Sequence, residues 1–313
     1  MKNRLMRIFR YLSVMLIATI LISCNKFNGS QEIPAYLRIG SWNLTTNYEK
    51  EGAATEAVTD AWVYINGSLQ GCYELKNHDD GVYVTVPVLD KGVKTVHLYP
   101  GVKMNGIAST RIQYPFYKPY KFTHEFVEGE IGTVSPSTKY YDVDSTRVRF
   151  KMMEDFEDIH NVKLDSTPSS KVRIVPVSHN DDPNAWVDPL HPLDYYRSGY
   201  IHLEDSINKF DIASKELVGL PTMGNYVMLE LDYKCSSEFL VGMYIMSAQN
   251  GIKDKELYYF RATDTWKKVY INFSPTVTEN SSASYVKFYL RGSISSGETA
   301  DFYFDNLKLI YIE

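Results

Sequence analysis

From residue 34 onward, the chain consists of short stretches in which apolar and polar residues alternate, separated by turn-forming residues. This period of two is typical of strands with one buried face. Residues 61–65 and 94–99 show it well, and Asn66-Gly67, directly after the first of them, is a strong signal for a β-hairpin. No stretch keeps a helical period, although residues 49–58 are compatible with a short helix. The pattern predicts an all-β protein.

The composition indicates a folded chain of two domains. At roughly 150 residues per domain, a length of 313 residues predicts two of them. An aromatic fraction of 14% beside 23% charged residues excludes a disordered chain, and the 25 Tyr residues favour strands. The net charge of -5 argues against a nucleic-acid partner, which would need a basic surface.

Turn-rich segments suggest where the two domains divide. We expect a first β-sandwich at residues 34–139 and a second at residues 140–313, with residues 133–144 as the link between them. The expected strands of the second domain cover residues 148–152, 172–177, 199–203, 226–233, 239–246, 256–262, 266–273, 284–290 and 301–312. Such a series of short strands is typical of a sandwich or jelly roll. Residues 178–197 are expected to form a long polar loop, and loops of that length are often functional.

The N-terminal segment has the features of a signal peptide. A cationic start precedes an apolar run at residues 11–22, which is short for a membrane span. The run ends in Leu21-Ile22-Ser23-Cys24, which resembles the lipobox of bacterial lipoproteins. The resemblance implies cleavage after residues 1–23, diacylation of the Cys24 thiol and anchoring by several acyl chains. The alternative is an uncleaved membrane anchor with an incidental cysteine.

The residues after the lipobox concern the destination of the protein. Residues 24–33 are polar and are expected to form a tether behind the lipid. By the sorting rule of other lipoproteins, Asn25 in place of Asp favours the outer membrane. Surface-exported lipoproteins of the Bacteroidota type often carry an acidic cluster here, whereas Glu32 stands alone. The periplasmic and cell-surface faces of that membrane therefore stay open as alternatives.

The first domain resembles the PEGA-like β domains of bacterial envelope proteins. The resemblance rests on residues 61–71 (AWVYINGSLQG), 89–92 (LDKG) and 96–101 (VHLYPG). Cys72-Tyr73 stand where that family usually has Thr-Pro. The resemblance implies a binding or spacer module and no enzyme.

The second domain resembles the galactose-binding-like jelly roll of carbohydrate-binding modules. The resemblance rests on residues 153–158 (MEDFED), 266–273 (WKKVYINF) and 300–309 (ADFYFDNLKL). In that family the opening acid and the closing Asp often clamp a structural calcium ion, which implies Glu157 and Asp305 as metal ligands here. The alternative is that both carboxylates lie at strand ends in water. The fold itself hosts binding, structural and catalytic roles.

Motifs of common enzymes are absent from the sequence. It contains no nucleophile elbow, Walker loop, zinc-protease motif or Cys-x-x-Cys. Carboxylates crowd residues 154–158, but a glycosidase pair normally faces its partner across a cleft from a separate strand. His179, His191 and His202 are too widely spaced for a compact metal motif. We therefore expect a protein that is not an enzyme and that requires no cofactor, apart from the calcium ion that the resemblance implies.

Two groups of aromatic residues are candidates for binding sites. The first lies in a proline-rich segment and comprises Tyr114, Phe116, Tyr117 and Tyr120. This segment is either a rigid loop for a protein partner or a plug against the neighbouring domain. The second group lies in the long polar loop and comprises Trp186, Tyr195 and Tyr196. Exposed there, these rings would offer flat apolar faces to a sugar; the alternative is that they fold onto the sandwich.

Modification candidates complete the sequence-based picture. Asp-Ser-Thr at Ser145 and Ser166, and Asp-Ser-Ile at Ser206, resemble the O-glycosylation sequon of exported Bacteroidota-type proteins. Chance and ordinary turn formation are the alternative explanation for these short patterns. Cys72 and Cys235 are expected to be buried free thiols rather than a disulfide.

Taken together, these features predict a non-catalytic outer-membrane lipoprotein that serves as a binding or scaffolding component of a cell-envelope assembly. The alternative is a surface glycan-binding lipoprotein of a polysaccharide-uptake system, and the third reading is a glycan-active enzyme. Exposure of the aromatic segment around Tyr117 would favour a protein partner. A groove lined by Trp186, Tyr195 and Tyr196 would favour a glycan.

The lipobox generates a direct prediction. Cys24→Ser removes the thiol that the acyl chains require, so the variant is expected to leave the membrane fraction and appear in the soluble fraction. Cell fractionation with immunoblotting measures this. A variant that stays with membranes through a salt wash would contradict the lipoprotein interpretation.

Overall fold

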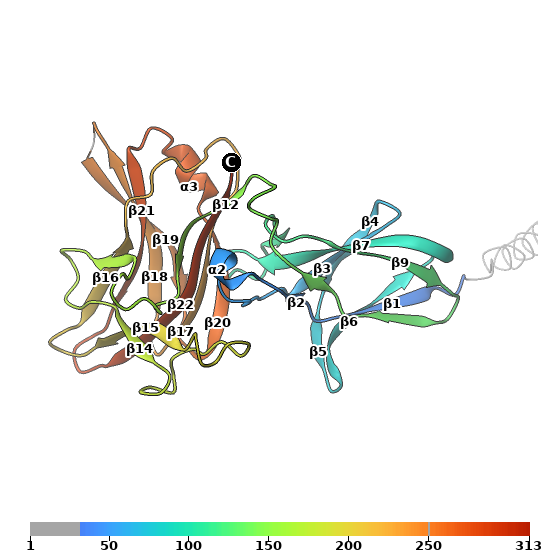
Figure 1. Ribbon diagram of the computed structural model, residues 1–313, viewed down its shortest axis with the longest axis horizontal. Helices are drawn as coiled ribbons and strands as arrows, with labels where there is room; N and C mark the ends of the chain where they lie inside the picture. Colours follow the sequence, from blue (N-terminus) through green and yellow to red (C-terminus); the bar gives the residue numbers. More distant parts are fainter. Residues whose placement is uncertain (1–31, 250) are drawn as a thin grey trace, which may run out of the picture.

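The computed structural model describes residues 32–249 and 251–313, so that the signal peptide, Cys24 and most of the tether lie outside the described residues. Two domains follow one another along the long axis of the molecule (Figure 1). Each is a sandwich of packed sheets, which confirms the predicted all-β fold with two β-sandwich domains. None of the helices in the described ranges has the length and hydropathy to cross a bilayer.

The first domain is built mainly from two sheets. Its elements are β1 (Ala35–Gly40), β2 (Asn43–Leu44), α2 (Tyr48–Glu51), β3 (Asp60–Ile65), β4 (Ser68–Glu74), β5 (Lys76–His78), β6 (Gly81–Val88), β7 (Gly92–Lys103), β8 (Arg111–Gln113), β9 (Tyr120–Phe126), β10 (Ile131–Val134) and β11 (Ser137–Thr138). One sheet has the strand order β10-β1-β6-β5. The other has the order β4-β3-β7-β8, with β9 also paired to β7.

Alternation along the strands forms the core of this first sandwich. Leu37 and Ile39 on β1 face Val63 on β3, and all three are fully buried. The predicted hairpin between β3 and β4 is confirmed. Asn66 and Gly67 both have positive φ, 48° and 81°, as a two-residue hairpin loop with a type I′ turn requires.

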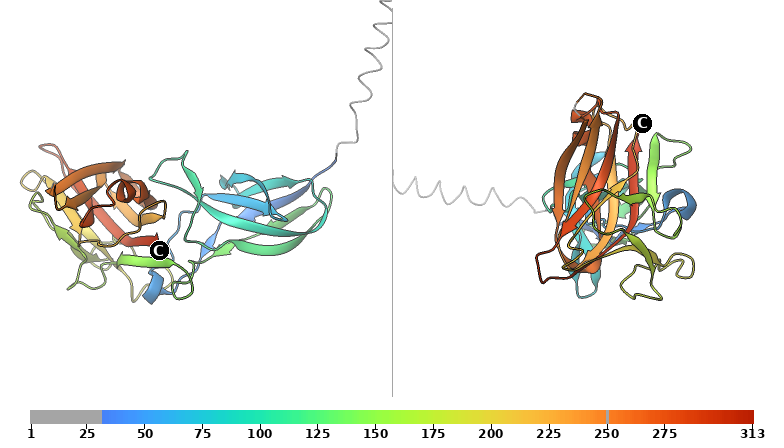
Figure 2. Two further views of the ribbon diagram at one scale, coloured as in Figure 1. Left: turned by 90° about the horizontal axis from the view of Figure 1, so that it is seen from above. Right: turned by 90° about the vertical axis from the view of Figure 1, so that its left-hand side faces the viewer.

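The second domain is a jelly-roll sandwich of two sheets that pack face to face (Figure 2). Its elements are β12 (Val148–Glu154), β13 (Leu164–Ser166), β14 (Val175–Ser178), β15 (Arg197–Leu203), β16 (Lys209–Ser214), β17 (Val227–Cys235), β18 (Phe239–Ser247), β19 (Gly251–Phe260), β20 (Thr263–Asn272), α3 (Ser274–Glu279), β21 (Tyr285–Ser293) and β22 (Ala300–Ile312). The sheet that meets the first domain, here called the interface sheet, has the order β14-β15-β22-β17-β20, with β12 also paired to β22. The far sheet has the order β13-β16-β21-β18-β19.

All the predicted strands of the second domain have counterparts in the structure, and two further strands appear. The sequence analysis does not predict β13 and β16. On β16 a buried carboxylate, Asp211, interrupts the apolar pattern by which a strand is found in a sequence. Arg291 on β21 neutralises this charge, with its Nε 3.0 Å from Asp211 Oδ2. The long polar loop between β14 and β15 is present as predicted.

The predicted link at residues 133–144 is packed structure rather than an open linker. Within this segment β10 pairs in parallel with β1, and β11 pairs with β2. Tyr140 is only 1% exposed, because it lies between the two domains. The chain thus passes from one domain to the other through packed structure.

The aromatic segment is a plug between the domains. Tyr114, Phe116 and Tyr117 are at most 2% exposed, and they pack with Tyr270 from the interface sheet. Tyr120 is half-buried and packs against the first-domain core. The interpretation of these four residues as an exposed partner-binding loop is therefore wrong, and the alternative of a plug is confirmed.

A second first-domain segment, residues 43–57, crosses onto the interface sheet and is here called the strap. It contains β2 and α2, and Figure 1 places α2 against the second domain. Lys308 Nζ on β22 donates to the Ala53 carbonyl at 2.7 Å, and the Ala57 N–H donates to the Tyr270 hydroxyl at 3.0 Å. These contacts hold the strap along the face of the sheet.

Beneath the plug and the strap lies a cluster of buried charges. Glu230 accepts hydrogen bonds from the hydroxyls of Tyr114 at 2.7 Å and Tyr140 at 2.8 Å. Lys268 Nζ lies 2.9 Å from Glu230 Oε2. Burial alone would raise the pKa of Glu230, but the nearby Lys268 and Lys308 hold it below its ordinary value. Burial also lowers the pKa of Lys308 to about 8.

Removing one member of this cluster is predicted to be costly. Glu230→Gln leaves Lys268 buried without its closest counter-charge, so the free energy of unfolding should fall by about 3–5 kcal/mol. Urea denaturation followed by tryptophan fluorescence measures the change. The matched control is Glu279→Gln, whose partner Lys255 forms an ion pair on the surface. That control should cost less than about 1 kcal/mol, and equal effects of the two variants would contradict the prediction.

Candidate functional site

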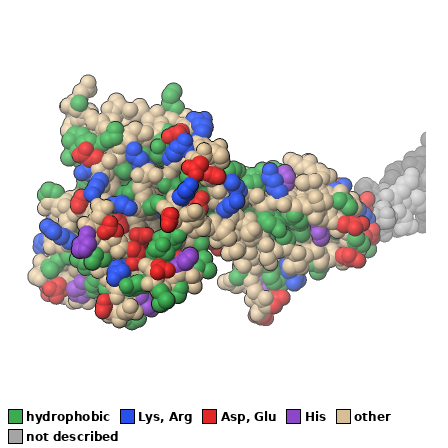
Figure 3. Space-filling model, in the orientation of Figure 1, with side chains coloured by type: hydrophobic (Ala, Val, Ile, Leu, Met, Phe, Trp, Pro, Cys, Tyr) green, Lys and Arg blue, Asp and Glu red, His purple; other side chains and the backbone are tan. Residues whose placement is uncertain are grey.

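The plug and the strap cover only part of the interface sheet. On the outward face beyond them, aromatic rings follow one another: Trp266 on β20 contacts Tyr303 on β22, and Tyr303 contacts Tyr200 on β15. The ring centroids are 6.5 Å and 4.9 Å apart, respectively. Trp186 joins them from the loop between β14 and β15. Over the wider surface, acidic and basic side chains are interspersed on the face drawn in Figure 3.

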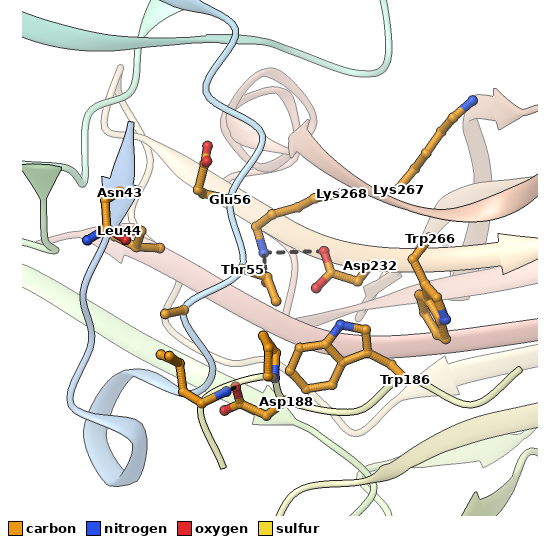
Figure 4. Close-up of a pocket in the computed structure, with 13 residues that line it drawn as sticks. Asn43, Leu44, Thr55, Glu56, Trp186, Asp188, Asp232, Trp266, Lys267 and Lys268 are labelled. Atoms are coloured by element: carbon orange, nitrogen blue, oxygen red, sulfur yellow. Dashed lines mark hydrogen bonds and ion pairs between the residues drawn. The ribbon is translucent and has the colours of Figure 1, made fainter. Parts of the chain in front are cut away.

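A pocket of about 410 Å³ lies between Trp186, Trp266 and the strap. In Figure 4 the indoles of Trp186 and Trp266 both lie close to Asp232, although they come from a loop and a strand far apart in sequence. Strap residues form one wall, and residues 188–190 form another. The pocket is therefore assembled from both domains.

The floor of the pocket carries an unusual carboxylate. Asp232 is 4% exposed, and Figure 4 shows its ion pair with Lys268. Lys268 Nζ is 3.6 Å from Asp232 Oδ1 and donates instead to the Thr55 hydroxyl of the strap at 3.0 Å. Burial raises the pKa of Asp232, and attraction to Lys268 offsets only part of this. The Asp232 carboxylate is therefore a closed part of the pocket floor, paired with Lys268.

Hydrogen bonds fix both tryptophans in place. The backbone N–H of Trp186 donates to the Ser198 hydroxyl at 2.8 Å. Trp266 Nε1 donates to the Asn184 carbonyl at 3.0 Å, which joins the loop to β20. Within the loop, Asp188 accepts from the Leu190 N–H at 2.8 Å. The indole of Trp266 and the backbone of Trp186 are thus held by the fold before any ligand arrives.

A second hollow of about 540 Å³ continues beyond Trp266. It is lined by Lys234, Asp301 and Tyr303, among others. Lys234 Nζ donates to Asn184 Oδ1 at 2.8 Å, and the Tyr303 hydroxyl donates to Asp182 Oδ2 at 2.6 Å. Polar groups therefore surround the aromatic rings on this side as well.

The structure does not bring the three predicted glycan-binding residues together. Trp186 lines the pocket, but Tyr195 stacks on Tyr48 of α2 with ring centroids 3.4 Å apart. Tyr196 lies against the Arg197 guanidinium, 4.6 Å from its ring centroid. The two tyrosines therefore stabilise the loop and do not line the pocket.

Trp266 is the binding candidate that the sequence analysis assigns only to a strand. The signal that points to it is its position, because it alternates with the buried Val269 and Ile271 and so shares the outward face with Lys268. Asp232 gives no comparable signal, since its burial and its pairing with Lys268 depend on contacts between segments distant in sequence.

Glu157 and Asp305 do not fit a calcium site. Glu157 accepts from the backbone N–H groups of Tyr196 and Arg197 and pairs with the Arg197 side chain at 3.1 Å. Asp305 accepts from the Ser198 hydroxyl at 2.8 Å, and burial raises its pKa well above the ordinary value. Among the described residues no group of three or more His, Cys, Asp or Glu side chains is arranged to hold a metal ion.

The serines of the predicted sequons lie in different settings. Ser145 and Ser206 are exposed in turns, where a glycan has room. Ser166 ends strand β13 rather than lying in a loop, and its hydroxyl donates to the Val172 carbonyl at 3.0 Å. Modification of these serines stays a prediction. Cys72 and Cys235 are free thiols as predicted, although Cys72 is half-buried rather than buried.

Comparison with known proteins places the chain near several β-sandwich structures. No family model and no curated protein matches it. The enzymatically active domain of bacteriophage CBA120 tailspike protein 4 is 14% identical with a TM-score of 0.36, covering 58% of this chain and 26% of that one. A family 11 carbohydrate-binding module from Clostridium thermocellum is 16% identical with a TM-score of 0.33, and the match covers 51% of this chain and 94% of that module. A family 61 carbohydrate-binding module solved with β-1,4-galactotriose is 12% identical with a TM-score of 0.33, and the match covers 53% of this chain and 99% of that module. These values assign the chain neither a family nor a ligand, so the ligand has to be inferred from the site itself.

The contacts of Glu157 generate a prediction about metal removal. Glu157→Gln loses the charge that faces Arg197, so the free energy of unfolding should fall by about 1–2 kcal/mol. A chelator such as EDTA should leave the melting temperature of the wild-type chain unchanged, because the carboxylate serves an ion pair. Thermal melts of both proteins with and without EDTA check this. Loss of stability in EDTA that is confined to the wild type would instead indicate a metal bound through Glu157.

Proposed function

We propose that this protein is a non-catalytic glycan-binding lipoprotein, anchored to the outer membrane through Cys24, and that the pocket between Trp186 and Trp266 is its binding site. The observation that carries the proposal is that two indoles, Trp186 and Trp266, line one pocket together with polar and charged side chains of both domains. The lipobox supports the anchoring.

The chemistry of the pocket matches a sugar ring. Pyranose rings have apolar faces formed by C–H groups, and an indole offers a flat surface of the same kind. Their hydroxyls donate and accept hydrogen bonds, for which the pocket offers exposed polar side chains such as Asn43 and Lys267.

The burial of the aromatic plug bears on the alternative of an envelope scaffold. That reading depends on exposure of Tyr114, Phe116 and Tyr117, which are in fact enclosed between the domains. Glycan capture at the membrane is therefore the function that the described surface supports best.

Removal of either indole tests the proposal. Trp186→Ala and Trp266→Ala should each weaken glycan binding at least about tenfold, equivalent to about 1.4 kcal/mol. Affinity electrophoresis can use β-1,3-1,4-glucan, β-1,4-galactan, β-1,4-xylan, β-1,4-mannan and polygalacturonate as probes, followed by calorimetry on the polymer that binds best. The matched control is Tyr259→Ala, which removes an aromatic ring that is 62% exposed on the far sheet.

The control should bind like the wild type, because Tyr259 lies on the opposite side of the second sandwich. Absence of binding to every probe would count against the proposed function. Equal weakening by Tyr259→Ala would show that the aromatic contacts are not specific to the pocket.

A further inference from the structure

The glycan site is closed at one end by the first domain. Resting on the proposed function, we infer that the site binds the terminal sugars of an uncharged glycan end-on and does not bind the interior of a chain. The argument depends on how the two hollows, the strap and the charged groups follow one another along the interface sheet.

The two hollows lie in sequence along one pair of strands. Asp232 on β17 stands beside Lys268 on β20, at the floor of the first pocket. Cys235 stands beside Thr263 further along the same two strands, in the second hollow. A glycan passing over Trp266 would therefore extend from the second hollow into the first.

In the opposite direction the same strands run beneath the first domain. The next pair after Asp232 and Lys268 on this face is Glu230 and Tyr270, which the plug covers. Leu44, Thr55 and other strap residues form the end wall of the pocket. A chain entering the first pocket thus meets the strap and has no path beyond it.

This end wall is anchored at three points. Ala53 and Ala57 bind Lys308 and Tyr270 through the backbone, and Thr55 accepts a hydrogen bond from Lys268. All three partners belong to the interface sheet, so the wall is part of the same packed structure as the floor. A segment held in this way is not displaced by a polymer without breaking buried hydrogen bonds.

The charges around the pocket disfavour an anionic ligand. Three carboxylates line it, those of Glu56, Asp188 and Asp232, against the two cations Lys267 and Lys268. Lys268 is already engaged with Glu230 at 2.9 Å. A uronic acid or a sulfated sugar would add negative charge beside these carboxylates, whereas an uncharged sugar adds none.

Binding stoichiometry distinguishes end-on from internal binding. Calorimetry would use the neutral polymer that binds best among the glucan, galactan, xylan and mannan named above, before and after partial hydrolysis that shortens the average chain tenfold. End-on binding predicts that the moles of protein bound per gram of glycan rise in proportion to the number of chain ends, about tenfold. Internal binding predicts a constant or smaller value, which would overturn the inference.

A variant of the strap tests whether the first domain forms the wall. Ala54 lines the pocket, and Ala54→Leu adds bulk to the wall, so affinity should fall at least tenfold while the melting temperature stays unchanged. The matched control is Ala108→Leu, the same change at an exposed first-domain position that does not line the pocket. Wild-type affinity in Ala54→Leu would overturn the proposed wall.

The outcomes separate this inference from the proposed function. If no polymer binds, the proposed function fails and the inference fails with it. A second outcome is that a polymer binds and Trp186→Ala abolishes the binding, but the moles of protein bound per gram of glycan do not rise with the number of chain ends. In that case only the end-on inference fails. Tighter binding to polygalacturonate than to the neutral polymers would overturn the part of the inference that concerns charge.

Discussion

The buried pair of Glu230 and Lys268 is the interaction on which the arrangement of this molecule depends. A carboxylate inside a protein is tolerated only when its oxygens find donors. Here the second domain supplies the lysine and the first domain supplies the hydroxyls of Tyr114 and Tyr140. Docking excludes water from Glu230, so these hydroxyls have to meet it in the closed interface, and this requirement orients two sandwiches that each have a core of their own.

Docking also shapes the candidate site. The strap that covers Lys308 and Tyr270 is the segment that walls the pocket beside Asp232. Stability and recognition therefore use the same residues, since Lys268 meets Glu230 on one side and Thr55 on the other. Substitutions of Lys268 or Thr55, which join the wall to the buried charges, are expected to affect both properties together.

The sequence predicts the fold where neighbouring residues decide it. The alternation around Val63, the Asn66-Gly67 turn and the long loop carrying Trp186 are all local features, and all three are confirmed. The role of Tyr114 could not be predicted, because its burial depends on Glu230, 116 positions away. Trp266 and Asp232 become a site only when a loop, two strands and a segment of the other domain meet. Proline and aromatic content cannot distinguish an exposed loop from a plug between domains.

The two-domain body also determines how far the site stands from the start of the described chain. In Figure 1, β1 begins at the outer end of the first domain, whereas the jelly roll lies at the opposite end of the long axis. Because the domains are joined through packed side chains, the first sandwich acts as a stiff stalk. A glycan held by such a body would be kept one domain length away from the start of β1. Torque on the bound chain would be transmitted through both domains to the start of β1.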